Sequence, residues 1–98
     1  MYKVIILPLA KKNIRKSAHW YNKQKKGLGK QFTSQIRKEI DYISQNPIAI
    51  QIRYNKIRTA VVKVFPFMIH YSIDPIHKLI IISGVYHTSQ NSKNWKGF

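Results

Sequence analysis

The sequence predicts an α+β fold in which one strand and a hairpin of two helices precede a three-stranded antiparallel meander. The first observation is a long run of strand-forming residues, 57–87, rich in Val, Ile, Phe and Tyr. The second is that apolar residues recur at helical spacing in two segments before this run. The third is that the breaks within 57–87 are short, and such connections join antiparallel strands. We expect residues 1–98 to form one domain, a two-layer sandwich of helices on a sheet.

The N-terminal half alternates between structure-forming segments and breakers. Residues 2–7 are expected to form a strand, and Pro8 to begin a helix, because the first helical position needs no N–H donor. The glycines of residues 25–29 separate this helix from a second one, which ends near Asn46-Pro47 because the residue before proline avoids the α region. The apolar stripes are Ala10, Ile14, Ser17 with Ala18, and Tyr21 on the first helix, and Phe32, Ile36, Ile40 and Ile43 on the second.

The C-terminal half predicts strands at 57–65, 67–73 and 78–87, separated by Pro66 and by a turn at 74–77. Alternation points Phe67, Ile69 and Tyr71 towards the helices, and Met68, His70 and Ser72 towards a partly open face. In the strand before, the apolar row is Ala60, Val62 and Val64. The last strand is apolar on both sides at 79–82, which is typical of a central strand or of one covered on both faces.

Chain direction follows from the order of these elements. We expect the N-terminal strand to be antiparallel to 57–65 and to 78–87, and residues 48–56 to form a partly extended connection between the second helix and the meander.

Composition restricts the possible functions. Eighteen Lys and Arg against three acids give a formal charge of +15, which favours an acidic partner such as nucleic acid or an acidic protein segment. The absence of cysteine, the three acids and the spacing of the four histidines indicate neither a metal site nor a cofactor. No apolar run reaches the roughly 20 residues of a membrane span, and the N-terminus lacks the features of a signal peptide, so we expect a cytoplasmic protein.

The polar side chains of the C-terminal half suit nucleic-acid chemistry. RNA carries its own nucleophile, the 2′-OH, so a protein needs only to move protons and to stabilise charge. The candidates are Lys63, His70, Tyr86, His87, Gln90 and Lys93. Structural roles compete with a function at several positions. His70 or His87 can be a surface residue without a function, Trp95 can pack the tail on the sheet, and the helical lysines can form a solvated face.

Several segments resemble the RelE/ParE toxin superfamily of bacterial type II toxin–antitoxin modules. The order of strand, helices and meander is similar, and the matching segments are 7–12 (LPLAKK), Asn46-Pro47, 65–74 (FPFMIHYSID) and 85–95 (VYHTSQNSKNW). The chain departs from the superfamily at three positions. Gln90 replaces an arginine of many ParE-like chains, Ser92 replaces their proline, and Met68 stands where RelE-type mRNA nucleases place an arginine.

The resemblance implies a ParE-like plasmid stabilisation toxin that inhibits growth by binding a cellular target, with DNA gyrase as the first candidate. It also implies an acidic cognate antitoxin as partner. The residues expected to bind target or antitoxin are Arg58, Tyr86, Gln90, Lys93 and Trp95. One alternative is a ribosome-dependent mRNA endoribonuclease, in which His87, Lys63 and His70 would be catalytic. Another is a non-toxic nucleic-acid-binding module.

Overall fold

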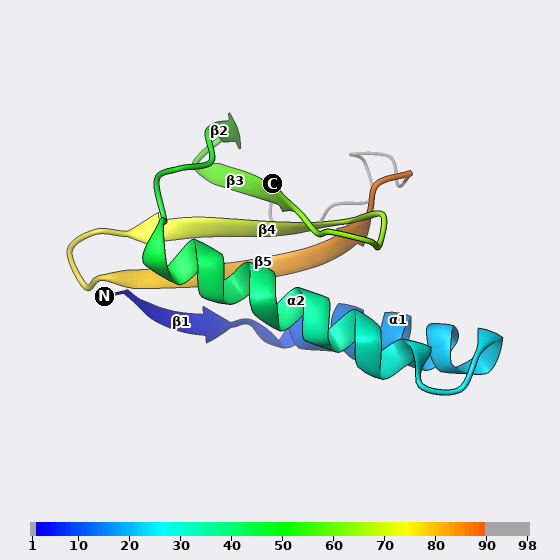
Figure 1. The fold of residues 1–98 in the computed structure, drawn as a ribbon. Helices are drawn as coiled ribbons and strands as arrows, with labels where there is room; N and C mark the ends of the chain where they lie inside the picture. The colour runs from blue at the N-terminus through cyan, green and yellow to red at the C-terminus, as the bar shows by residue number, and fades with distance from the viewer. Residues whose placement is uncertain (1, 90–98) are drawn as a thin grey trace.

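Two helices, α1 (Pro8–Gln24) and α2 (Leu28–Gln45), form the predicted hairpin and cover one face of a sheet (Figure 1). The structure is a computed structural model that describes residues 2–89. Pro8 occupies the start of α1, and Gly27, at φ 85°, makes the left-handed turn into α2. The predicted helix start at Pro8 and the predicted glycine breaker therefore both lie at helix ends. Within the described residues, neither helix has the length and apolar character that a bilayer crossing requires.

The helices touch backbone to backbone near the turn. A Cβ atom at Gly29 would lie 2.3 Å from the carbonyl oxygen of Ala18, so only glycine fits at this crossing. The N–H of Gly29 donates to Oδ1 of Asn22 over 2.8 Å. Asn22 thus caps α2 from the neighbouring helix, where the N-cap Gly27 has no side chain to do so.

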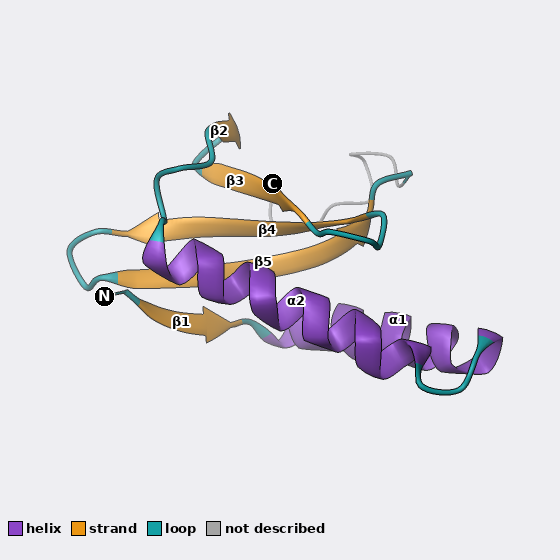
Figure 2. Cartoon of the chain, viewed as in Figure 1, coloured by secondary structure: helices purple, strands orange, loops and turns teal. Residues whose placement is uncertain are grey.

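The sheet has five strands in the order β1-β5-β4-β3-β2 (Figure 2). The strands are β1 (Lys3–Ile6), β2 (Ile52–Tyr54), β3 (Ile57–Val61), β4 (Phe67–Asp74) and β5 (Leu79–His87). The long strands β4 and β5 lie in the interior of the sheet, which confirms the prediction that the last strand is internal. The α+β class and the order of the predicted elements are also confirmed.

The predicted direction of the N-terminal strand is wrong. β1 pairs with β5 in parallel, from Lys3 opposite Leu79 to Ile6 opposite Ile82. The cause is the short strand β2, which pairs antiparallel with β3 and adds one reversal of direction between α2 and the meander. The sequence predicted this segment only as a connection, because its three residues are too few for a clear alternation.

The predicted strand 57–65 ends earlier, at Val61, and its apolar row stops at Val62. Val64 is 83% exposed and has a φ of 75°, so its prediction as a row member is wrong. The backbone turns here because the N–H of Val62 donates to the carbonyl of Phe67, while the N–H of Phe67 donates to that of Phe65. Phe65 returns to the core, leaving Val64 at the tip of the connection.

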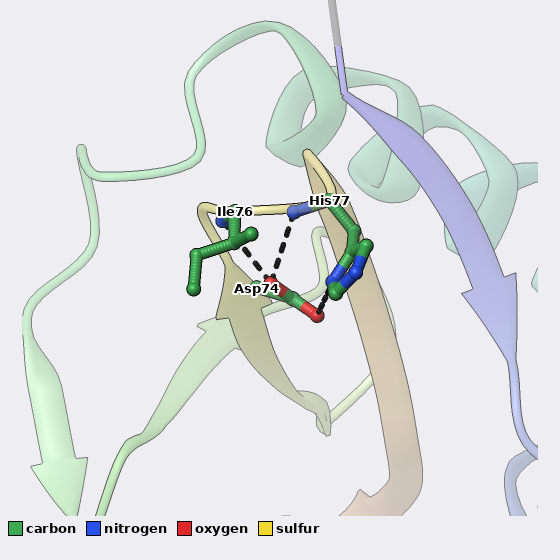
Figure 3. Close-up of polar contacts among 3 residues, drawn as sticks. All are labelled: Asp74, Ile76 and His77. Carbon is green, nitrogen blue, oxygen red and sulfur yellow. Dashed lines mark hydrogen bonds and ion pairs between the residues drawn. The ribbon is translucent and has the colours of Figure 1, made fainter.

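The turn between β4 and β5 forms around the carboxylate of Asp74 (Figure 3). Its Oδ1 accepts the backbone N–H groups of Ile76 and His77, both over 3.1 Å, and its Oδ2 lies 2.8 Å from Nδ1 of His77. The backbone N–H of His77 is the largest cause that lowers the pKa of Asp74. The predicted Asp-Pro turn is therefore confirmed, with the side chain as its centre.

The core lies between the helix hairpin and one sheet face, and it contains the predicted residues. Phe67, Ile69 and Tyr71 of β4 are buried with Phe32 and Ile36 of α2. Ile14 and Ile40 are partly buried against them. Aromatic rings fill the end near the helix turn, where the ring centroid of Phe32 lies 4.9 Å from that of Phe67.

We predict that Ile36→Ala lowers the free energy of unfolding by about 2–5 kcal/mol, because Ile36 is only 2% exposed and its loss leaves a cavity. Chemical denaturation measures this change. Ile76→Ala is the matched control, since Ile76 is 86% exposed, and it should change stability by no more than about 0.5 kcal/mol. An equal effect of the two substitutions would contradict the placement of the core.

Candidate functional site

One extra residue in β5 determines which side chains reach each face of the sheet. His70 pairs with Gly84, whereas its neighbour Tyr71 pairs with Ile82, so Ser83 has no opposite residue on β4. This is a β-bulge, which changes the alternation of the strand that contains it.

The bulge shifts the helix-facing positions of β5 by one residue. Before it, Ile80 and Ile82 belong to the main core; after it, Val85 does. Tyr86 consequently lies on the opposite face, and His87 lies on the helix side, opposite Phe67. A regular strand would have exchanged the faces of Tyr86 and His87.

The helix layer stabilises the bulge through Asn13 of α1. The N–H of Val85 donates to Oδ1 of Asn13 over 3.1 Å. A bulge disturbs the ladder of hydrogen bonds, and a buried N–H without an acceptor is costly. The Asn13 side chain therefore supplies an acceptor at the point where the pairing changes.

The opposite face carries a compact group that we call the outer-face cluster, consisting of Arg53, Tyr54, Met68, His70 and Tyr86. His70 is fully buried, with Met68 and Tyr86 exposed by only 6% and 4%. Nδ1 of His70 lies 2.8 Å from the Tyr54 hydroxyl, and the His70 ring is 5.0 Å from that of Tyr86, nearly perpendicular to it. The face predicted as partly open is thus covered at this end by its own side chains.

Electrostatics keep this cluster uncharged at its centre. Burial, followed by the nearby Arg53 guanidinium, lowers the pKa of His70 from its ordinary value of 6.5 to about 4. Burial, followed by Tyr86, raises the pKa of Tyr54. At neutral pH His70 is therefore a neutral imidazole hydrogen-bonded to a neutral phenol.

Gly84 makes room for the cluster and was not among the predicted site residues. A Cβ atom at this position would lie 2.4 Å from the ring of Tyr86, which covers the glycine. A glycine inside an apolar strand is a known signal for a bulge or a close approach, so the sequence did contain a clue.

His87 lies across the sheet from the cluster, in a groove of about 540 Å³ between α1 and the ends of β4 and β5. Lys16 and Trp20 of α1 line the same groove. Nδ1 of His87 accepts the backbone N–H of Ser89 over 3.0 Å. Because Nδ1 acts as an acceptor, the neutral ring carries its proton on Nε2.

The comparisons with known proteins identify the family of this fold. The family described as "ParE toxin of type II toxin-antitoxin system, parDE" matches residues 4–92. The chain belongs to the ParE toxin family. No curated protein sequence matches it.

Two solved structures resemble this ParE-family chain. A chain of the chromosomal ParDE system from P. aeruginosa superposes with a TM-score of 0.79 at 15% identity, covering 91% of this chain and 98% of its own. A chain of the toxin–antitoxin complex RelBE2 from Mycobacterium tuberculosis superposes with a TM-score of 0.63 at 14% identity, covering 88% and 96%. At these identities the likeness shows a shared fold.

The three residues predicted as catalytic in a nuclease occupy three different places. His70 lies in the outer-face cluster, and His87 lies in the groove on the helix side. Lys63 is exposed beyond the end of β3. Burial raises the pKa of Glu39, and the positive charge of Lys63 opposes this increase. The catalytic roles remain predictions, and the structure does not bring these side chains together around one point.

The residues predicted to bind a partner also separate. Tyr86 belongs to the outer-face cluster. The Arg58 guanidinium is half-buried and donates to the carbonyl of Ile50, which holds the connection between α2 and β2. Gln90, Lys93 and Trp95 lie outside the described residues. Among residues 2–89, no three His, Asp or Glu side chains gather in a way that could hold a metal ion.

We predict that Gly84→Ala lowers the free energy of unfolding by about 1–3 kcal/mol, because its methyl group displaces the Tyr86 ring. A double-mutant cycle with Tyr86→Ala measures the origin of this cost. In the Tyr86→Ala background the same glycine substitution should cost much less. Equal costs in both backgrounds would mean that Gly84 is needed for another reason.

The lowered pKa of His70 predicts a dependence of stability on pH. Between its folded pKa of about 4 and its ordinary value of 6.5, the unfolded chain binds the extra proton, so stability falls as the pH decreases through this window. Lowering the pH from 7 to 4.5 should remove about 2 kcal/mol through this histidine.

Urea denaturation at several pH values tests this dependence. His70→Gln should flatten the curve, and His19→Gln, at an exposed position, is the matched control. If both variants keep the wild-type slope, His70 is not the group that titrates.

Proposed function

We propose that this ParE-family chain inhibits growth by binding a cellular protein, with DNA gyrase as the first candidate, and that an acidic antitoxin neutralises it. The observation that carries the proposal is the state of the outer-face cluster. Met68, which stands where RelE-type nucleases place an arginine, is buried beside a neutral, buried His70. His70 therefore offers RNA no imidazolium proton at neutral pH, and β4 offers no cation.

The acidic partner follows from charge and family. The chain carries a formal charge of +15, and its family description names a toxin–antitoxin system. An acidic antitoxin would offset the self-repulsion of so basic a fold and stabilise it by binding only the folded state.

A second candidate function, ribosome-dependent mRNA cleavage, is favoured by Arg53. Its guanidinium reaches across from β2 and lies 3.6 Å from the sulfur of Met68. A cation is therefore present near the position of the missing arginine, although another strand supplies it. In this alternative Arg53 would stabilise developing charge on the outer face. His87 lies on the opposite face of the sheet, so any proton that it transfers would be at a separate reacting centre.

We predict that induction of the wild-type chain stops DNA replication before translation and leaves transcripts uncut at ribosomes. The readouts are nucleotide and amino-acid incorporation, transcript mapping, and supercoiling by purified gyrase, which the toxin should inhibit. Arg53→Ala and His87→Ala should produce no change in transcript integrity.

Lys12→Ala, on the exposed side of α1, is the control for loss of one positive charge. Transcripts cut at ribosomes, with the cutting lost in Arg53→Ala or His87→Ala but not in Lys12→Ala, would replace the binding mechanism by the nuclease.

A further inference from the structure

Val64 combines a strained backbone with an exposed apolar side chain. Its φ of 75° lies in the left-handed region, which a β-branched residue enters only at a cost, and its side chain is 83% exposed. Glycine would relieve the strain, and a polar residue would suit the exposure. Since neither burial nor backbone geometry explains valine here, its methyl groups are available for a contact outside the fold.

The surroundings of Val64 form a groove with a positive wall. Together with Phe65, Val64 borders a space of about 580 Å³ along α2. Lys30, Ser34 and Lys38 also line this groove, and they follow one another at intervals of four residues on the same side of the helix. The groove therefore presents two ammonium groups on one side and an apolar tip on the other.

The chemistry of this groove favours a protein over a nucleic acid. Phosphates would engage the two lysines but would gain nothing from the exposed methyl groups of Val64. Protein interfaces combine an apolar contact with a polar rim, and an acidic peptide complements both the lysines and the net charge of +15.

We infer that the groove between α2 and the β3–β4 connection is a docking surface for an acidic segment of the antitoxin, with Val64 as its apolar contact. This inference rests on the proposed function, since it assigns the surface through which that partner binds. It also explains the strain: the loop holds Val64 in an exposed position for the partner at the expense of the stability of the free toxin.

The test measures stability and affinity in the same variants of the full chain. Val64→Gly should raise the melting temperature by several degrees and weaken binding of the protein encoded beside this chain by about tenfold, because strain and contact are lost together. Lys30→Gln with Lys38→Gln should weaken binding about fivefold at low salt and reduce its salt dependence.

Two control variants make comparable substitutions at positions outside the groove. Asn55→Gly replaces another residue with positive φ, at 48°, and should leave affinity unchanged. Lys12→Gln with Lys23→Gln removes two exposed charges from α1, so it should weaken binding less than the groove pair. The same variants are titrated against a labelled single-stranded RNA and a labelled DNA duplex.

The outcomes separate the two proposals. If the wild type binds its neighbour and the groove variants bind equally well, or if they lose only nucleic-acid binding, the groove is not the docking surface. If Val64→Gly is no more stable than the wild type, the strain argument fails. If the wild type does not bind the neighbouring protein at all, the proposed antitoxin partnership fails, and the docking surface with it.

Discussion

The arrangement of side chains around the candidate sites depends on the bulge at Ser83 in β5. By adding one residue between Ile82 and Gly84, the bulge turns Tyr86 to the outer face and His87 to the helix side. Asn13 supplies an acceptor at this point from α1, and Gly84 leaves space for the ring of Tyr86. Ser83, Gly84 and Val85 thus link the sheet register, the outer-face cluster and the packing of α1.

The outer face and the helix side of the sheet differ in their chemistry. The outer-face cluster is closed and uncharged at its centre, with His70 buried between two tyrosine rings. The helix side is open near His87, and the groove along α2 is open and basic. A buried, neutral cluster suits a structural role, whereas open, basic grooves suit binding, in agreement with the proposal that this toxin acts through protein contacts.

The sequence was sufficient for the parts of the fold that depend on periodicity and breakers. Pro8, Gly27 and Pro47 end or begin elements as predicted, and the core face of β4 follows strict alternation. The sequence was insufficient where single residues change direction. Three residues in β2 reverse the chain and make β1 parallel to β5, and one bulge residue exchanges two faces. Neither event leaves a periodic signal, because each involves fewer residues than the roughly four over which an alternation can be recognised.

The same limit applies to the candidate site. Residue types singled out His70 and His87, but the separation of these side chains on two faces depends on the bulge. Asn13 and Arg53 make their contacts with residues far away in the sequence, which residue types alone do not indicate. Val64 is a further case, since a β-branched residue disfavours the positive φ that Val64 adopts here. Such departures occur where local preference conflicts with the tertiary structure, and they are the positions at which function is most often found.

The central claim, that the bulge places Tyr86 with His70 and His87 with Phe67, is tested most directly by a NOESY spectrum of the full chain. The account predicts cross-peaks between the rings of Tyr86 and His70, whose centroids are 5.0 Å apart, and between those of His87 and Phe67, 5.2 Å apart. A cross-peak between Tyr86 and Phe67, with none between Tyr86 and His70, would show a regular strand without the bulge and would contradict the account.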